Sequence, residues 1–161
     1  FTFDATNAID GDNPIRNIQI VQNANYVVIL SEYFSAVRVI RLGTEHIEYQ
    51  GEKWLGDSIA HYEGDSLVIH SKNFRPEQSN FFLRSTAQLQ ITETYTSVSA
   101  DELLFSYTLS DPRIYSRSVT AEIPLRRMAP GQKIYEYACH EGNYSLPSIL
   151  QAARMRESQA R

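Results

Sequence analysis

The sequence is poor in cysteine, in basic charge and in long hydrophobic runs. A single cysteine, Cys139, among 161 residues excludes a disulfide within the chain. No segment approaches the roughly 20 apolar residues of a membrane-spanning helix, so we expect no membrane span. The 15 basic residues are outnumbered by 19 acidic ones, and the net charge is -4. Because nucleic-acid binders need a basic stripe that neutralises phosphates, we expect no nucleic-acid partner.

Motifs that hold common cofactors are also missing. The seven glycines are scattered and form no phosphate-binding loop, and there is no Gly-x-Ser-x-Gly sequence. The run 61–65 and His70 contain metal-binding residue types, but metal sites need three or four converging ligands, and a turn at Gly64 explains the acidic residues. The sequence therefore predicts no cofactor and no metal, and Cys139 is interpreted as a small core residue.

The length and composition are typical of one globular domain. Hydrophobic residues make up 42% of the chain and charged residues 21%. We expect residues 1–161 to form a single domain with an N-terminal arm or loop at 1–14, a β-barrel at 15–139 and a helix at 145–157. The chain starts at Phe1 without a signal peptide, which indicates a processed or trimmed start.

Short runs that alternate apolar and polar residues predict about ten strands. The runs are rich in Val, Ile, Tyr, Thr and Phe, which suit a half-buried pleated surface. They are Ile18–Val21, Tyr26–Glu32, Ala36–Leu42, His46–Tyr49, Ser58–Glu63, Ser66–Ser71, Ala87–Val98, Glu102–Ser110, Ile114–Leu125 and Lys133–Cys139.

The connections favour an antiparallel barrel. Turn residues at 63–65, 99–101 and 111–113 link consecutive runs closely, which is typical of hairpins. A mainly β fold of this kind, an antiparallel meander, closes into a barrel because closure removes exposed edges. The segment 72–86 breaks the pattern and is interpreted as a long, lid-like loop. Leu146, Ile149, Leu150 and Ala153 recur at helix spacing, so a short C-terminal helix should lay this stripe on the β structure.

Two charged residues fall on faces that should point inward. Alternation places Glu93 with Leu89, Ile91 and Tyr95, and Arg117 with Tyr115 and Val119, because residues i and i+2 of a strand share a face. A buried charge needs a partner. We therefore predict that Glu93 and Arg117 form an ion pair or share a ligand.

Further polar residues extend this interior site. Arg38 is preferred over Arg41 as the inward arginine because it lies in mid-strand, and His61 shares a face with Ile59. Tyr95, Tyr107 and Tyr115 would line the pocket, and His140 and Asn143 lie where the barrel mouth is expected, as further ligand-binding residues. An imidazole such as that of His61 can donate or accept a proton, Glu93 can orient it or act as a base, and the arginines can stabilise an anion.

The segments 35–42, 56–74, 91–117 and 135–154 resemble a family of largely uncharacterised bacterial proteins. Its motifs are a His-aromatic-Glu-Gly-Asp run, a Glu in a long strand, a Tyr-x-Arg after an Asp-Pro turn and a Cys-x-Glu-x-Asn segment near the end. The resemblance implies export, hence a periplasmic or secreted location, and by analogy a calycin- or lipocalin-like barrel. It places these residues on motif positions: Arg38, His61, Glu63, Asp65, Glu93, Tyr115, Arg117, His140, Glu141 and Asn143.

Three functions remain open at this point. The first is a small-molecule-binding barrel whose charged interior takes a partly hydrophobic ligand, with an anionic group as one option. The second is an enzyme without organic cofactor, a lyase, isomerase or hydrolase, in which His61, Glu93 and Arg117 are catalytic. The third is a structural or interaction module whose inner charges only fix strand register. The pattern leaves the ligand and the oligomeric state open.

Overall fold

The computed structural model describes residues 2–4, 17–43, 45–48, 51–78, 84–138, 141–142 and 144–159. The strands are β1 (Thr2–Asp4), β2 (Ile18–Gln22), β3 (Tyr26–Ser31), β4 (Val37–Leu42), β5 (Asp57–Glu63), β6 (Ser66–Lys72), β7 (Gln90–Ser99), β8 (Glu102–Ser110) and β9 (Val119–Arg127). The helical elements in these ranges are two 3-10 turns, η1 (Tyr33–Ser35) and η2 (Pro76–Gln78), and the α-helix α1 (Ser145–Gln159).

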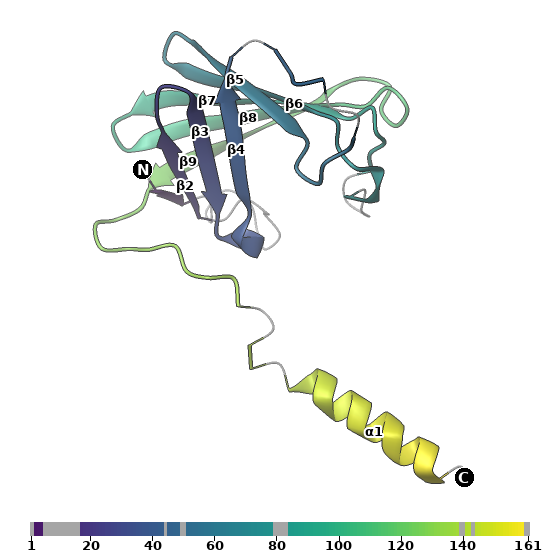
Figure 1. Ribbon diagram of the computed structural model, residues 1–161. Coiled ribbons are helices and arrows are strands. Elements are labelled where there is room, and N and C mark those ends of the chain that lie inside the picture. Colours follow the sequence, from purple (N-terminus) through teal and green to yellow (C-terminus); the bar gives the residue numbers. More distant parts are fainter. Residues whose placement is uncertain are drawn as a thin grey trace.

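The strands form one curled sheet that closes into a barrel (Figure 1). β2 to β9 follow one another in chain order, and the short β1 pairs with both β2 and β9, which joins the two edges. The mainly β, barrel-like fold with a short C-terminal helix is therefore confirmed. The predicted turns at Gly64-Asp65 and Ala100-Asp101 connect β5 to β6 and β7 to β8.

The predicted antiparallel meander is wrong at one step, because β4 and β5 run parallel. Arg41 lies opposite Ile59 and Leu42 opposite Ala60 in this pair. Parallel neighbours need a crossover of about a dozen residues, and the connection 43–56 provides it. The predicted strand 46–49 falls in this connection, and its residues 46–48 form no strand. His46 instead places its ring against Asp57, at 2.8 Å.

The strand predicted from Ile114 begins later, at Val119. The amides of Ile114 and Tyr115 donate to the carbonyl of Asp111, at 3.0 and 2.8 Å, which holds the chain in a turn. The Asp111 side chain is buried and accepts a hydrogen bond from the amide of Thr86. Residues 111–118 therefore lie outside the sheet.

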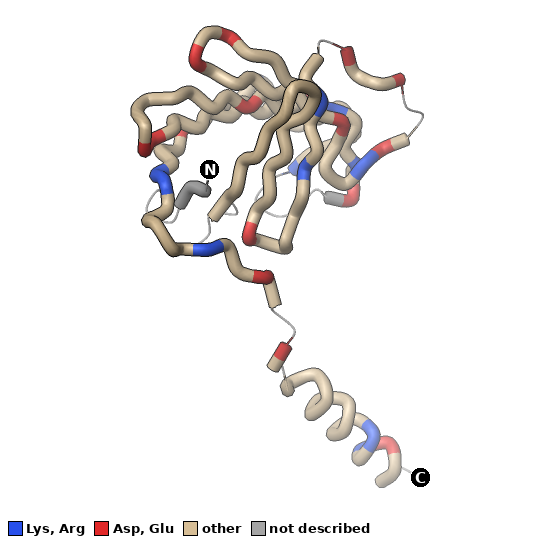
Figure 2. The backbone as a smooth tube through the Cα atoms, turned by 60° about the vertical axis from the view of Figure 1, so that its left-hand side comes forward, with Lys and Arg blue, Asp and Glu red and all other residues tan. Residues whose placement is uncertain are grey.

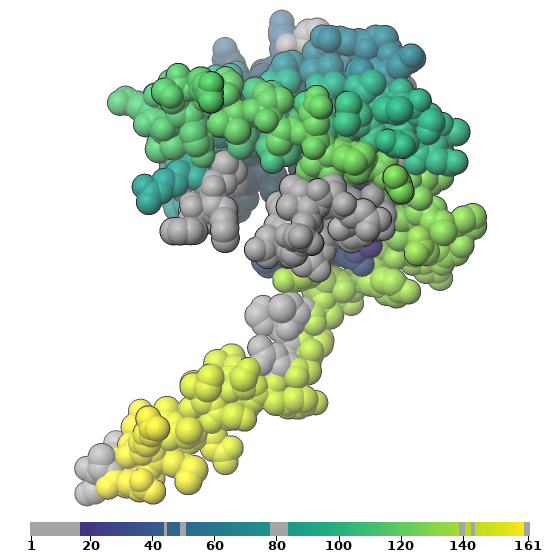
Figure 3. Space-filling model, turned by 180° about the vertical axis from the view of Figure 1, so that it is seen from behind, coloured from purple at the N-terminus to yellow at the C-terminus, as the bar shows by residue number. Residues whose placement is uncertain are grey.

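The C-terminal part also departs from expectation. Residues 133–138 of the predicted strand 133–139 form no strand, and the amides of Tyr135 and Tyr137 bond the side chains of Glu32 and Ser35. Helix α1 is present where it was predicted, but it buries no residue and extends away from the barrel (Figures 1 and 3). The expectation that its apolar stripe packs on the β structure is thus wrong. Within the predicted arm 1–14, residues 2–4 belong to β1, and the rest lie outside the described residues.

Inward-facing residues of β2 to β9 supply the main apolar core. Lys, Arg, Asp and Glu lie mainly in turns and loops, while the strand bodies are mostly uncharged (Figure 2). The buried apolar cluster draws on every strand from β2 to β9 and consists of Ile18, Val27, Ile29, Ile40, Ala60, Leu67, Ile69, Tyr95, Phe105, Ile123 and Leu125.

Gly56, which enters β5, allows a close backbone approach that another residue would obstruct. Its φ is +68°, and a Cβ atom would lie 2.7 Å from the carbonyl oxygen of Lys72 and 2.8 Å from the ring of Phe74. Gly64 has a similar φ of +57° but open space around it.

We expect Gly64→Ala to lower the free energy of unfolding by about 1 kcal/mol, from the left-handed conformation alone. Gly56→Ala should cost about 1–3 kcal/mol more, because a Cβ is forced into packed atoms. Urea unfolding of both variants tests this, and equal losses would contradict it.

Candidate functional site

A charged cluster lies inside the barrel, between strands that are not neighbours. Arg38 of β4 binds Glu93 of β7 through two hydrogen bonds, Nη1 to Oε1 at 2.7 Å and Nη2 to Oε2 at 2.5 Å. Arg38 Nη2 also lies 3.3 Å from Ser58 Oγ and 3.2 Å from Ser71 Oγ, and the two hydroxyl oxygens are 2.7 Å apart. This arrangement gives both charges their partners within the barrel.

The electrostatics of this cluster follow from burial and pairing. Burial alone would lower the pKa of Arg38, but the charge and hydrogen bonds of Glu93 outweigh it and raise that pKa. Burial also raises the pKa of Tyr95, and the nearby Glu93 carboxylate adds to this effect. Arg38 therefore stays a cation and Tyr95 a neutral phenol.

The predicted partner of Glu93 is wrong. Arg117 lies in the exposed turn before β9 and does not face the interior, because the strand starts two residues after it. The inward placement of Arg38 and Glu93 is confirmed, and their ion pair replaces the predicted one. Tyr107 lies directly opposite Glu93 on β8, and its ring centroid is 5.6 Å from that of Phe105.

His61 and Glu93 lie on opposite sides of the sheet. His61 pairs with Val68 and Val68 with Thr94, so His61 shares a face with Thr94 and not with Glu93. Its ring stacks on His70 with centroids 5.7 Å apart, and its Nε2 lies 2.8 Å from Glu63 Oε1. The prediction that His61 faces inward is therefore wrong, and the geometry does not bring it to Glu93 as an acid–base partner.

The Tyr115 side chain links two loops and does not line the barrel interior. Its hydroxyl donates to the carbonyl oxygen of Arg84, at 2.9 Å, and ties the turn 111–118 to the segment that precedes β7. The prediction that Tyr115 lines the pocket is wrong because Tyr115, like Arg117, lies in the turn before β9. His140 and Asn143, also predicted to bind a ligand, lie outside the described residues, as do residues 79–83 of the predicted lid at 72–86.

A second charged cluster, which the sequence pattern missed, lies on the outer side of β5. Asp57 is 3% exposed and contacts Arg41 Nη2 at 3.2 Å, His46 Nδ1 at 2.8 Å and Lys53 Nζ at 3.6 Å. Burial alone would raise the pKa of Asp57, but the hydrogen bonds from His46 and Arg41 and the charges of Arg41 and Lys53 lower it. This cluster holds the connection 43–56 against the barrel.

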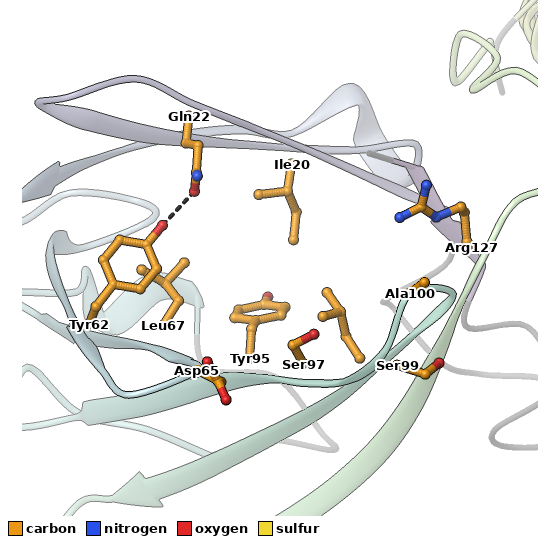
Figure 4. A pocket seen from close by; sticks show the side chains of 11 residues that line it. Ile20, Gln22, Tyr62, Asp65, Leu67, Tyr95, Ser97, Ser99, Ala100 and Arg127 are labelled. Atoms are coloured by element: carbon orange, nitrogen blue, oxygen red, sulfur yellow. Dashed lines mark hydrogen bonds between the residues drawn. The ribbon is translucent and has the colours of Figure 1, made fainter.

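A pocket of about 300 Å³ opens at the barrel mouth (Figure 4). The Tyr62 hydroxyl of β5 donates to the side-chain oxygen of Gln22 on β2 and bridges one side of the mouth. Tyr95, 6% exposed, lies beneath it, with its ring stacked on Phe105 at 4.6 Å. The lining residues are Ile20, Gln22, Tyr62, Asp65, Leu67, Tyr95, Ser97, Ser99, Ala100, Leu103 and Arg127.

Tyr95 is the residue of this lining that was predicted as ligand-binding, and the alternation rule would have found two more. Arg127 continues the inner set of β9, two residues beyond Leu125. Gln22 continues Ile18 and Ile20 in the same way. Tyr62 was missed because the opposite face of β5 was taken as the inner one.

Two further findings concern metal binding and membrane-spanning helices. Within the described ranges, no three His, Cys, Asp or Glu side chains converge so that they could hold a metal ion. None of the helical segments in those ranges is long and apolar enough to cross a membrane.

Comparison with protein-family models, curated proteins and solved structures finds no match for this chain. The resemblance to the exported bacterial family therefore stays a prediction, as does the periplasmic or secreted location that it implies. What the site can do is inferred from its own geometry.

The Arg38–Glu93 pair should be costly to break on one side and cheap to replace as a whole. Glu93→Gln leaves the guanidinium without its counter-charge, and we expect a loss of about 2–4 kcal/mol, since Arg38 keeps 21% of its side chain exposed. The double variant Arg38→Met/Glu93→Leu should recover most of that loss, because apolar side chains of similar size suit the interior. Urea unfolding measures both. A single variant as stable as the parent chain would show that the pair does not hold the barrel.

Asp57 should contribute to acid sensitivity. A carboxyl whose pKa is lowered on folding stabilises the protein above its unfolded pKa of about 3.9, and this contribution disappears as the pH falls through the folded value. Between pH 5 and pH 2, the free energy of unfolding of Asp57→Asn should therefore fall less steeply than that of the parent chain. Asp65→Asn, at an exposed turn, is the control and should keep the parental slope. Identical slopes for parent and Asp57→Asn would refute the assignment.

Proposed function

We propose that this protein binds a small, partly apolar molecule with an anionic group in the pocket at the barrel mouth. The observation that carries the proposal is an apolar hollow with a guanidinium at its edge. Small-molecule sites are concave and mainly apolar, with a few polar groups that fix orientation. A volume of about 300 Å³ fits a ligand at the small end of that range.

The apolar part of the ligand would lie on the pocket floor. Ile20, Leu67 and Leu103 provide aliphatic surface, and the buried Tyr95 ring provides an aromatic one. Since Tyr95 is already stacked on Phe105, its ring is held in place before a ligand arrives. A ring or short chain would therefore displace water without reordering the floor.

The charges at the mouth give the ligand a direction. Arg127 ends β9, Asp65 lies in the turn between β5 and β6, and the two lie on different sides of the pocket (Figure 4). Arg127 Nε lies 3.3 Å from Asp101 Oδ1. The two side chains of this ion pair are 39% and 80% exposed, and exposed ion pairs contribute little to stability. A guanidinium has five donors, so Arg127 can bind an anion beside Asp101. Asp65 would repel an anion from the opposite side.

Binding should depend on open space at Ser97. Ser97 lines the pocket, whereas its neighbour Val98 is 58% exposed outside the lining, so the two positions form a matched pair. Ser97→Trp should fill the pocket and weaken binding of 2-naphthoate at least about tenfold, which corresponds to about 1.4 kcal/mol, whereas Val98→Trp should leave it unchanged.

Arg127→Gln should weaken binding of 2-naphthoate but not of the neutral 2-naphthalenemethanol, while Arg126→Gln should affect neither.

The measurement is a titration of each probe followed by chemical-shift changes of the backbone amides. Shifts at Leu67, Ser97 and Leu103 would locate the probe at the mouth. If neither probe binds the parent chain, or if Ser97→Trp and Val98→Trp weaken binding equally, the proposed pocket is not the binding site.

A further inference from the structure

The outer face of β2, β3 and β4 carries an exposed apolar surface. Strand register places Val28 directly between Val21 and Val39, and Leu30 beside Val37. These five residues point away from the core, since Val27, Ile29 and Ile40 of the same strands are buried. Val21, Val37 and Val39 are 54%, 51% and 61% exposed. We call Val21, Val28, Leu30, Val37 and Val39 the outer valine face.

Helix α1 carries the second exposed apolar surface. Leu146, Ile149, Leu150 and Ala153 follow the i, i+3, i+4, i+7 spacing of one helix face. No residue of α1 is buried, and Leu146, Ile149 and Leu150 are 61%, 64% and 49% exposed. An isolated helix of 15 residues is marginal in water, and most helices are stabilised by packing of an apolar face. The stripe therefore requires a partner surface.

The two surfaces match in size. From Leu146 to Ala153 the stripe is about 10 Å long, at a rise of about 1.5 Å per residue. Three adjacent strands are about 10 Å wide from the first to the third, at a spacing of about 4.8 Å. Each chain carries one stripe and one outer valine face. In a pair of chains, each stripe can therefore cover the outer valine face of the other chain.

The chain is anchored to its own barrel ahead of α1, and α1 points away from that barrel. The amides of Tyr135 and Tyr137 bond Glu32 Oε1 at 3.1 Å and Ser35 Oγ at 3.3 Å, and the Tyr137 ring lies 4.8 Å from the ring of Phe34. These contacts fix the segment at the turn between β3 and β4. Beyond it, α1 extends outward in both Figure 1 and Figure 3. The helix is thus presented to a neighbour rather than to the face beside its anchor.

We infer that α1 of each chain packs its stripe on the outer valine face of a second copy, in a twofold dimer that exchanges C-terminal helices. Twofold symmetry makes the two helix–face contacts identical, and exchange of an identical element is a common route to dimers. The inference is independent of the pocket, because the outer valine face is on the opposite side of the strands from the pocket floor.

The test is the mass of the full chain in solution, by light scattering after size-exclusion chromatography. The full chain should have about twice the mass of one 18.4 kDa chain. Ile149→Glu and Val39→Lys should each give monomers, whereas Gln151→Glu, on the opposite side of the helix, should stay dimeric. An equal mixture of Ile149→Glu and Val39→Lys should regain dimers, since one intact stripe then meets one intact face.

Cross-linking distinguishes exchange from packing within one chain. In a Cys139→Ser background, oxidation of the double variant Val39→Cys/Ile149→Cys should give a disulfide between two chains on a non-reducing gel. A disulfide within one chain would show that α1 folds back on its own barrel, and would overturn the inference. A parent chain that is monomeric at every concentration up to about 0.5 mM would overturn it too, because exchange of this kind is favoured by concentration.

Discussion

The ion pair between Arg38 and Glu93 is the constraint on which the barrel depends. It links β4 to β7 across the interior, over the two strands that lie between them, so it can form only when the sheet is curled and both side chains point inward. A slip of one residue in either strand would turn a charge to the outside and leave the other buried without a partner. Ser58 and Ser71 add to this requirement, since their hydroxyls occupy the space around the guanidinium. One pair of charges thereby makes the register of four strands interdependent.

Where the alternation was unbroken, the sequence predicted the interior correctly. β7 alternates from Ile91 to Thr96, and Glu93 and Tyr95 are buried as expected. The partner of Glu93 was missed because alternation in 114–118 mimics a strand, whereas the backbone amides of Ile114 and Tyr115 are bonded to Asp111. Hydrogen bonds of this kind decide whether a segment joins the sheet, and they depend on the position of Thr86, distant in the sequence, which bonds the Asp111 side chain. No local pattern contains that information.

β5 shows a different limit of sequence-based prediction. Its first four residues, Asp57–Ala60, are all buried, because the core covers one face and the connection 43–56 covers the other. A strand buried on both faces does not alternate, so the inner face could not be identified, and His61 was chosen in place of Tyr62. The sequence pattern also did not indicate that Asp57 lies in a charged cluster. Its partners Arg41, His46 and Lys53 come together only through the parallel crossover.

The interior is therefore divided into a part that holds the Arg38–Glu93 ion pair and an open, mainly apolar part, with Tyr95 between them. Tyr95 lies two residues from Glu93 on the same face of β7, and its ring forms the floor of the pocket. Because Arg38 and Glu93 neutralise each other, their net charge contributes little to the potential at the mouth. The charge that a ligand meets is set by Arg127 and Asp65 at the rim, where solvent exposure lets each form new contacts. The ion pair that stabilises the barrel thus leaves the selection of a ligand to the residues at its mouth.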